Sequence, residues 1–439
     1  MKALVQNGRL IDPLQGIDEI CDIHIEGGRI QEVRKRGGAE ARKKKNPAVR
    51  AARLPGYQVI DATGMYVVPG LIDLHVHLRE PGFEHKETIK TGTGAAARGG
   101  FTSVCCMPNT RPVNDNASVT EFILSKARVE GSCSVLPIGA ITKGQKGEEL
   151  AEFSLMREAG CVAFSDDGRP VMDSLLMRRA LEYSRVHDLP VISHCEDLAL
   201  AASGVMNEGL LSVTLGLRGT PAQAEEIMVA RDISLAELTG GRLHIAHVST
   251  AGSVEIIRAA KRRGIADVTA ETCPHYFSIT EEAVREYDAN AKVNPPLRRQ
   301  SDVEAIREGL RDGVIDAIAT DHAPHHRDEK EGEFDLAPSG ISGLETAVGL
   351  AMRLVADGVL SMTMLVEKMA VNPARIVGNG GGTLKPGADA DLVIIDPRRE
   401  YRVDAGDFAS KGRNTPFGGW LLPAVPVVTI WKGKVYTWE

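Results

Sequence analysis

The sequence lacks the features that would mark a membrane or a secreted protein. It has no run of the about 20 uninterrupted apolar residues that a membrane span needs. Its start, MKALVQNGRLIDP, is too polar for a secretory signal. Only seven cysteines are present, and the adjacent pair Cys105 and Cys106 suits neither a zinc ribbon nor an ordinary disulfide. We therefore expect a protein of the reducing cytoplasm.

The sequence also lacks a net positive charge, although one segment is strongly basic. The formal net charge of -7 and the pI near 6.0 argue against nucleic acid as the main partner. The exception is segment 34–53, RKRGGAEARKKKNPAVRAAR, which is strongly basic but has no aromatic side chain that could stack on a base. We interpret it as a solvated insertion in a hairpin connection, with polyanion binding as the alternative.

The middle of the chain repeats a short apolar run that ends in polar residues and precedes a helix-like stretch. The runs are YVVPGLIDLHVH, TSVCCMPNT, SVLPIGAIT, CVAFSDDG, PVISHCED, RLHIAHVST, VTAETCPHY and IDAIATDHAPH. Strands that alternate with helices predict right-handed crossovers and a parallel sheet. Eight such units, without a glycine-rich dinucleotide fingerprint after the first, favour a (β/α)8 barrel over an open Rossmann-type sheet.

The two ends of the chain show a different pattern. KALVQNGRLID and DIHIEGGRIQEV near the start are short alternating segments with Asn-Gly and Gly-Gly turns, and ADLVIIDP through PVVTIWKGKVYTWE near the end is also β-rich. Neither piece is large enough to close its own core, so we expect both to pair in one small β-sandwich domain beside the barrel. The predicted division gives 1–65 and 376–439 to that domain and 66–375 to the barrel.

Polar residues stand where the predicted strands end, and a barrel of this kind carries its functional groups there. They are His75 and His77 on strand one, Asp166 and Asp167 on strand four, His194 on strand five, His247 on strand six and Asp321 on strand eight. Imidazoles and carboxylates at this density predict a site for a borderline divalent metal, zinc first. More than four ligands, with a carboxylate able to bridge, indicate two metals about 3.5–4 Å apart.

The other histidines have a simpler interpretation, because a single histidine at a strand end is more often a hydrogen-bonded structural residue. This applies to His24, His85, His187, His244, His322 and His326, which we expect at the surface or in packing. His275 ends strand seven and is kept out of the site, with a place behind the ligands as the alternative. Cys195 and Cys273 are interpreted as small packing groups.

Several motifs resemble those of dihydroorotases in the amidohydrolase superfamily. DLHVHLREPG and ATDHAPHHRDEK are similar to the two family signatures, and KVNPPLR, ISGLETAVGL and GADADLVIID extend the resemblance over nearly the whole chain. Many relatives bridge two metals with a carboxylated lysine on strand four, where this chain has CVAFSDDG and no lysine. That departure is similar to class I dihydroorotases of the multi-subunit bacterial type. The resemblance assigns the bridge to Asp167, with Asp166 as the alternative, and implies assembly without carbon dioxide.

The resemblance also implies a role for each residue of the site. One zinc would be held by His75, His77 and Asp321 and a second by His194 and His247, with Asp167 between them. Asp321 would also be the acid–base group. The substrate carboxylate would be bound by Arg79, Asn109 and His325, while Asn294 and the backbone of Ser339 and Gly340 would contact the ring, with His77 beside the substrate. Ser339 stands where related proteins often have an aromatic residue.

The reaction implied by the resemblance is the reversible hydrolysis of (S)-dihydroorotate to N-carbamoyl-L-aspartate in pyrimidine (UMP) biosynthesis. A homodimer is expected, and a complex with aspartate transcarbamoylase stays open. A hydantoinase or dihydropyrimidinase is the nearest rival, but its substrates lack the carboxylate that Arg79, Asn109 and His325 would bind. An inactive scaffold for aspartate transcarbamoylase would be expected to lack ligands that this chain has. The charged loop after strand eight, HRDEKEGEFDLAPSG, is either a lid or a static loop.

Overall fold

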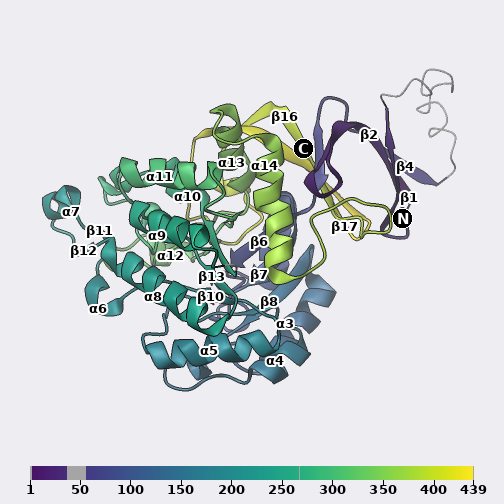
Figure 1. Ribbon diagram of the computed structural model, residues 1–439. Coiled ribbons are helices and arrows are strands. Elements are labelled where there is room, and N and C mark those ends of the chain that lie inside the picture. The colour runs from purple at the N-terminus through teal and green to yellow at the C-terminus, as the bar shows by residue number, and fades with distance from the viewer. Residues whose placement is uncertain (1, 37–55, 266, 439) are drawn as a thin grey trace.

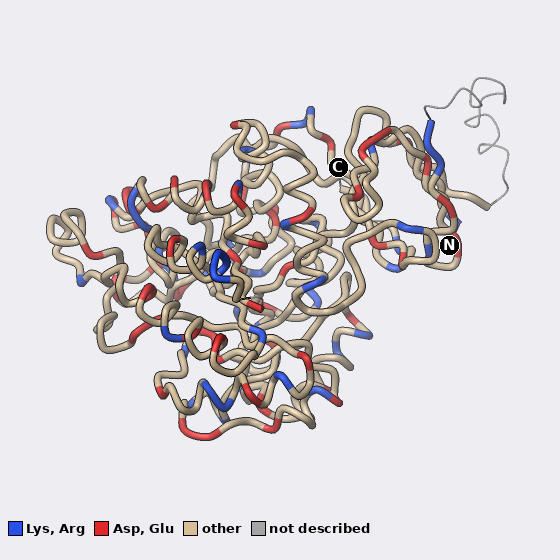
Figure 2. Tube along the Cα trace, viewed as in Figure 1, with Lys and Arg blue, Asp and Glu red and all other residues tan. Residues whose placement is uncertain are grey.

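The computed structural model describes residues 2–36, 56–265 and 267–438. In these residues the chain forms a barrel surrounded by helices, with a separate β-sheet on one side that carries both ends of the chain (Figure 1). Most of the basic segment predicted at 34–53 falls outside the described residues. Over the described chain, acidic and basic residues are intermixed along the trace (Figure 2).

The barrel strands follow the predicted order along the chain. They are β6 (Leu71–Val76), β7 (Phe101–Cys106), β8 (Ser134–Gly139), β9 (Ala163–Phe164), β10 (Val191–Ser193), β13 (Leu243–Ile245), β14 (Val268–Thr272) and β15 (Ala317–Ile318). Neighbours in this order pair in parallel. A parallel bridge between Val76 and His322 brings the last strand beside the first. The predicted (β/α)8 barrel is confirmed.

A buried aspartate reinforces the contact between the first and last strands. Asp73 accepts hydrogen bonds from the backbone N–H of Thr320 (3.1 Å) and from its Oγ1 (2.6 Å). The N–H of His75 donates to the same carboxylate at 3.1 Å. Burial raises the pKa of Asp73 to about 6, although the Thr320 hydrogen bonds oppose the shift. Asp73 thereby links the strand that carries His75 to the segment that leads into Asp321.

Helices cover the outside of the barrel (Figure 1). The longer ones are α2 (Ile89–Arg98), α3 (Ala117–Glu130), α4 (Phe153–Ala159), α5 (Ser174–Val186), α8 (Gln223–Thr239), α9 (Ala251–Arg262), α11 (Gln300–Arg311) and α13 (Ala347–Ala356). Shorter elements are α6 (Leu198–Ala201), α7 (Leu210–Leu215), α10 (Pro274–Ser278), α12 (Arg327–Lys330), α14 (Met362–Val366), α15 (Asn372–Val377), β11 (Met206–Asn207) and β12 (Gly219–Thr220). Among the described residues, none of the helices combines the length and apolar character needed to cross a membrane.

The flanking sheet is built from both ends of the chain, as predicted. Its hydrogen-bonded order is β18 (Lys434–Thr437), β17 (Leu421–Trp431), β16 (Leu392–Arg402), β5 (Tyr66–Pro69), β1 (Lys2–Asp12), β2 (Ile17–Glu26) and β3 (Arg29–Lys35), and β4 (Tyr57–Asp61) also pairs with β1. β5 lies just past residue 65 and joins the two ends, because it pairs with β1 on one side and β16 on the other.

Each body has its own apolar core. In the flanking sheet, Val5, Ile23 and Leu392 belong to one buried cluster that draws on both ends of the chain. Within the barrel, side chains of the parallel strands form another cluster, which includes Leu74 of β6 and Ile192 of β10. These cores leave the carboxyl ends of the barrel strands free for polar residues, and the candidate site lies there.

Candidate active site

The residues predicted at the strand ends meet at one rim of the barrel. His75 lies in β6 and His77 just after it, while Asp167, His194, His247 and Asp321 follow β9, β10, β13 and β15. Their exposed fractions run from 0% to 7%, so charges and lone pairs here interact with little screening by water.

Two carboxylates face the imidazoles of the first strand. Nε2 of His75 lies 3.3 Å from Oδ1 of Asp167 and 3.5 Å from Oδ1 of Asp321. Nε2 of His77 lies 3.2 Å from Oδ1 of Asp321 and 3.5 Å from Oδ2 of Asp167. His75, His77 and Asp321 therefore form one compact group of potential ligands.

Asp167 also faces His194 and His247, the histidines that follow β10 and β13. Its Oδ1 lies 3.4 Å from Nδ1 of His194 and 3.5 Å from Nε2 of His247. Those two nitrogens are 2.8 Å apart. Asp167 thus lies within 3.5 Å of a nitrogen of all four histidines, between the two groups of donors.

The hydrogen bonds of the histidines indicate which nitrogens are available to a metal. His75 donates from Nδ1 to Glu271 (2.9 Å), His77 from Nδ1 to Asn109 (2.8 Å) and His194 from Nε2 to Glu196 (3.1 Å). An imidazole that binds a metal is neutral and has one N–H, so the opposite nitrogen of each ring, which faces Asp167, is the one that would offer a lone pair. Nε2 of His75 is buried with no hydrogen-bond partner in the described part of the chain. Imidazoles held in this way fit a zinc site.

The neighbouring Asp166 has a different set of contacts. Its carboxylate accepts hydrogen bonds from the N–H of Ile141 (2.8 Å) and of Thr142 (3.1 Å), and from the hydroxyl of Thr142. Burial raises the pKa of Asp166 to about 6, with the Thr142 hydrogen bonds opposing the shift. Of the two aspartates that the sequence leaves open, Asp167 lies among the histidines and Asp166 holds the loop after β8.

Three residues of the site have a left-handed backbone. The φ angles are 62° at Arg79, 33° at His247 and 46° at Asp321. This region costs a residue other than glycine about 1–3 kcal/mol and persists only where the surrounding structure imposes it. At the strand ends it aims these side chains into the rim.

A cationic group adjoins the donors. Arg79 donates from Nε to the carbonyl of Pro324 (3.3 Å), and Lys86 lies 3.3 Å from Nδ1 of His325. Nε2 of His325 donates to the carbonyl of Ser339 (2.9 Å). Burial, together with Arg79 and Lys86, lowers the pKa of His325 to about 2, so its ring is neutral beside the two cations. Burial lowers the pKa of Arg79 to about 10, which leaves it charged at neutral pH.

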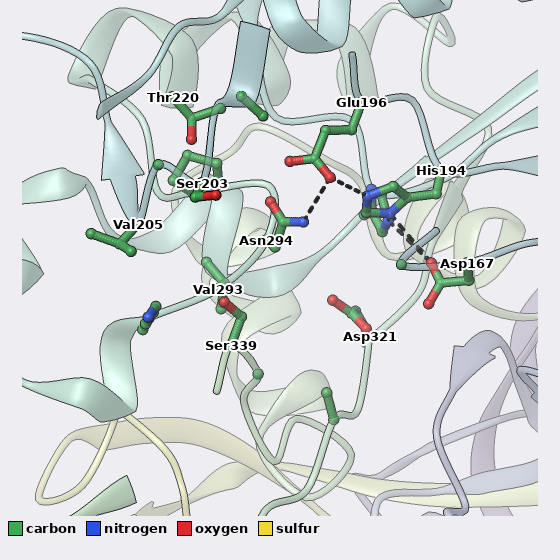
Figure 3. A pocket seen from close by; sticks show the side chains of 18 of the residues that line it. Asp167, His194, Glu196, Ser203, Val205, Thr220, Val293, Asn294, Asp321 and Ser339 are labelled. Atoms are coloured by element: carbon green, nitrogen blue, oxygen red, sulfur yellow. Dashed lines mark hydrogen bonds and ion pairs between the residues drawn. The ribbon is translucent and has the colours of Figure 1, made fainter. Parts of the chain in front are cut away.

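The cavity is also lined by Asn294 and by the loop of Ser339 and Gly340. Asn294 donates from Nδ2 to Oε2 of Glu196 (3.1 Å), the same oxygen that accepts from His194 (Figure 3). Gly340 has a φ of 145° and leaves no room for a side chain, because a Cβ there would lie 2.6 Å from the carbonyl oxygen of Ala323. The close approach of these backbones explains the glycine.

One cavity of about 650 Å³ contains nearly all of these groups. Every residue that the sequence predicts for the site lines it except His75, which lies fully buried behind the wall. This volume falls in the range of small-molecule sites. The structure therefore brings a donor set that could hold a metal and the guanidinium of Arg79 together in one pocket.

Comparison with known proteins agrees with this geometry. Residues 64–253 match the family described as "Dihydro-orotase-like". A dihydroorotase of Geobacter metallireducens is 57% identical over 99% of both chains, and one of Pelotomaculum thermopropionicum is 59% identical over 99% of this chain and 98% of its own. The chain belongs to the dihydroorotase family.

Among solved structures, an L-hydantoinase (dihydropyrimidinase) of Arthrobacter aurescens has the same architecture. It superposes with a TM-score of 0.86 and 26% identity, and the match covers 99% of this chain and 96% of that one. The dihydroorotase family and this hydantoinase thus share a barrel with a flanking sheet, and the difference between them must be sought in the cavity.

Several contributors to this dihydroorotase-family site escaped the sequence analysis. Glu271, which orients His75, lies inside β14 with its side chain fully buried, and Glu196 lies two residues past His194. The signal for Glu271 was available, because a charged residue within an otherwise buried strand requires a partner. His244 had been interpreted as a surface or packing residue, and it is buried with Nε2 3.2 Å from Glu271.

The remaining rim histidine and cysteines have other surroundings than the candidate donors. Burial lowers the pKa of His275 to about 4, and this residue is not among those that line the cavity. Cys195 and Cys273 are buried and free. His322 is also buried and bridges the first and last strands, where its Nδ1 accepts the N–H of Gly343 at 3.2 Å.

Proposed function

We propose that this chain is a zinc-dependent dihydroorotase, which catalyses the reversible hydrolysis of (S)-dihydroorotate to N-carbamoyl-L-aspartate in pyrimidine (UMP) biosynthesis. The observation that carries the proposal is the guanidinium of Arg79 beside the donor set in one cavity, with Lys86 outside the lining of that cavity. The donors suit amide hydrolysis, and the guanidinium suits a carboxylate. Dihydroorotate combines a cyclic amide with a carboxylate, and the family named for it includes this chain.

The donor set would hold two zinc ions. His75, His77 and Asp321 would bind one and His194 and His247 the other, with Asp167 shared between them. When bound, zinc lowers the pKa of water toward about 7 and polarises a carbonyl oxygen, which are the two requirements of amide hydrolysis. Because no lysine belongs to this set, metal binding is expected not to depend on carbon dioxide.

Asp321 is the group proposed to move the proton. Burial alone would raise its pKa, but His75 and His77 outweigh burial and hold the pKa of Asp321 well below its usual range. The carboxylate is therefore ionised at neutral pH. An ionised carboxylate at this place is suited to accept a proton from water and to pass it to the ring nitrogen as the amide C–N bond breaks.

Arg79 is the main candidate for the substrate carboxylate. Its planar guanidinium can donate two parallel N–H bonds to a carboxylate, whereas Lys86 is paired with Glu329 at 2.9 Å. Asn109, which accepts from His77, and His325 complete the group. Asn294 and the backbone of Ser339 and Gly340 line the same cavity, where they would contact the ring.

A hydantoinase is the second candidate, because the L-hydantoinase of Arthrobacter aurescens shares the fold. Hydantoins and dihydropyrimidines lack the carboxylate, so Arg79 would have no anionic partner in the substrate. The deciding experiment gives the zinc-loaded protein dihydroorotate, dihydrouracil and hydantoin, and follows loss of the cyclic amide by ultraviolet absorbance before and after chelation. We expect turnover of dihydroorotate that chelation abolishes and zinc restores. Faster turnover of either uncharged ring would contradict the proposal.

Arg79→Lys tests the carboxylate contact directly. The variant keeps the charge but loses the planar fork, so the KM for dihydroorotate is expected to rise by about 10-fold or more. The matched control is Arg169→Lys, at an exposed arginine beside the cavity mouth, which should leave KM unchanged. Equal kinetics of Arg79→Lys and the wild type would remove Arg79 from the site.

The proposal extends to the setting of the enzyme. All seven cysteines are free and buried, which supports a reducing compartment such as the cytoplasm. A homodimer and a complex with aspartate transcarbamoylase stay predictions. Sedimentation of the protein alone and mixed with aspartate transcarbamoylase measures both.

A further inference from the structure

A segment of the chain far from the barrel strands reaches the candidate site. The connection between β16 and β17 passes through η6 (Ala405–Asp407) and then runs as Ser410–Asn414 along the barrel rim. Asn414 lies in this segment and is only 3% exposed. The sequence pattern places this whole region in the small β domain, whereas Asn414 contacts Ala323, Gly340 and His325 in the cavity wall.

The side chain of Asn414 has its full complement of hydrogen bonds. Nδ2 donates to the carbonyls of Ala323 (3.0 Å) and Gly340 (2.9 Å). Oδ1 accepts from the N–H of His325 (3.0 Å) and from Oγ of Ser342 (3.0 Å). An amide side chain has two N–H donors and two acceptor sites, so none is left over. The backbone carbonyl of Asn414 adds a fifth bond from the N–H of Ser342 (2.7 Å).

These partners belong to the two backbone segments that would bind opposite ends of the substrate. One segment, 323–325, carries His325 and the Pro324 carbonyl that accepts from Arg79. The other, 339–342, carries Ser339 and Gly340. The segments also bond directly, from the N–H of Ala323 to the carbonyl of Ile341 (2.9 Å) and from Nε2 of His325 to the carbonyl of Ser339 (2.9 Å). Asn414 bonds to both segments and adds four side-chain hydrogen bonds to this junction, so it helps to fix the distance from the carboxylate group to the ring-binding backbone.

Steric contacts make the same junction rigid. A Cβ on Gly412 would lie 2.5 Å from Cβ of Pro324 and 2.6 Å from Oγ of Ser342. The hydroxyl of Ser410 donates to Glu87, which in turn lies 3.4 Å from Nε2 of His322. The segment is thus anchored on both sides of Gly412, and the backbones in contact have no space in which to shift.

We propose that Asn414 is a positioning residue for substrate binding, which holds the carboxylate-binding group and the ring-binding backbone at a fixed separation. The inference rests on the proposed function for its substrate. It assigns to the β16–β17 connection a part in the site that neither the family motifs nor the donor set indicates. Because Asn414 touches backbone and not the reacting atoms, its loss should weaken binding more than turnover.

The test compares Asn414→Ala and Asn414→Asp with the wild-type, zinc-loaded full chain. Asn414→Asp keeps the shape but places carboxylate oxygens against the carbonyls of Ala323 and Gly340. The matched control is Asn372→Ala, because Asn372 also donates to a backbone carbonyl, that of Asp316 (2.8 Å), but before the start of β15 at the other end of the barrel. Readouts are KM and kcat in both directions, zinc content, and hydrogen exchange of peptides that cover 323–342.

We expect KM for dihydroorotate and for N-carbamoyl-L-aspartate to rise about 10-fold in both Asn414 variants. The fall in kcat should be smaller than the rise in KM, zinc content should stay unchanged, and exchange in 323–342 should become faster. Asn372→Ala should keep the wild-type KM. An unchanged KM in Asn414→Ala would overturn the inference.

Two further outcomes keep the test decisive. If the Asn414 variants do not fold, Gly412→Ala strains the same junction without removing a hydrogen bond, and a wild-type KM in that variant would overturn the inference. If the wild type does not act on dihydroorotate, the proposed function fails, and exchange then decides the rest. Unchanged exchange in Asn414→Ala would also overturn the inference, while faster exchange confined to 323–342 would support it.

Discussion

Asp321 combines two tasks that a single substitution can separate. Its carboxylate lies 3.2 Å from His77 and 3.5 Å from His75, where it can serve as a ligand, and it is also the proposed proton carrier. Asp321→Asn keeps one oxygen for the metal but removes the group that exchanges a proton. We expect kcat to fall by about 10²–10⁴-fold while much of the zinc is retained. Measurement of kcat beside zinc content tests this, and near-normal turnover would remove Asp321 as the acid–base group.

Glu271 acts one layer behind the ligands. It accepts from Nδ1 of His75 at 2.9 Å, and hydrogen bonds from His244 and His75 outweigh its burial and lower its pKa to about 2. Glu271→Gln places either an amide NH2 or an uncharged amide oxygen opposite Nδ1 of His75. The orientation of the His75 ring, and so of the lone pair on its Nε2, is then less firmly fixed. We expect the affinity for zinc to fall about 10–100-fold, measured by competition with a chelator.

The control for Glu271→Gln is a carboxylate that is equally buried but remote. Asp12 is 0% exposed and accepts from Thr383 Oγ1 (2.9 Å) and the N–H of Leu384 (2.7 Å) in the flanking sheet. Asp12→Asn should cost stability but keep the wild-type zinc affinity. Equal zinc affinities in both variants would mean that Glu271 serves only packing.

At the scale of elements, two lysines form hydrogen bonds that hold the loop after β15, the eighth barrel strand. Lys330 donates to the carbonyls of Ala289 (2.8 Å) and Pro338 (2.7 Å). Lys292 donates to the carbonyls of Phe334 and Asp335, both at 2.9 Å. These contacts hold the charged loop against the segment that precedes Asn294. They favour the static loop over a lid, and identical hydrogen exchange with and without substrate would support that choice.

Lys330 should also make the stability of this loop depend on pH. Burial, with Lys292 nearby, lowers the pKa of Lys330 to about 7, whereas an unfolded lysine titrates near about 10.4. Between these values the unfolded chain holds a proton that the folded chain has lost. The free energy of unfolding therefore rises with pH in this window, with an upper bound of about 1.4 kcal/mol per pH unit, and Lys330 adds no pH dependence below it.

The variant Lys330→Met removes this dependence. The difference in unfolding free energy between the wild type and Lys330→Met should grow from pH 7 toward pH 10, because other titrating groups cancel in the difference. Denaturant unfolding of both proteins at several pH values measures it. Parallel curves over this range would show that the folded pKa of Lys330 is not lowered.

For the whole molecule, the barrel and the donor set could be predicted because both follow from local pattern. Each strand is an apolar run, and residues such as His194 and Asp321 come directly after such runs. The choice between Asp166 and Asp167 could not be made, because both follow the same strand and only their contacts differ. The contact of Asn414 with the site could not be predicted from the sequence, for another reason. No periodicity relates it to Gly340, and their contact exists only once the chain has folded.

The donor set also links the metal to the stability of the entire fold. His75, His194, His247 and Asp321 come from strands spread around the barrel, and Asp167 joins them within 3.5 Å only in the folded chain. A ligand that binds the folded state alone stabilises it by about 4 kcal/mol at a thousandfold excess over its Kd.

We expect calorimetry to show a higher unfolding temperature with zinc than after chelation. The shift should shrink in His194→Ala and persist in His187→Ala, since His187 contacts Ser154 outside the site at 2.9 Å. Equal zinc shifts in the two variants would exclude His194 from the metal site, because a ligand that contributes nothing to binding contributes nothing to this stabilisation.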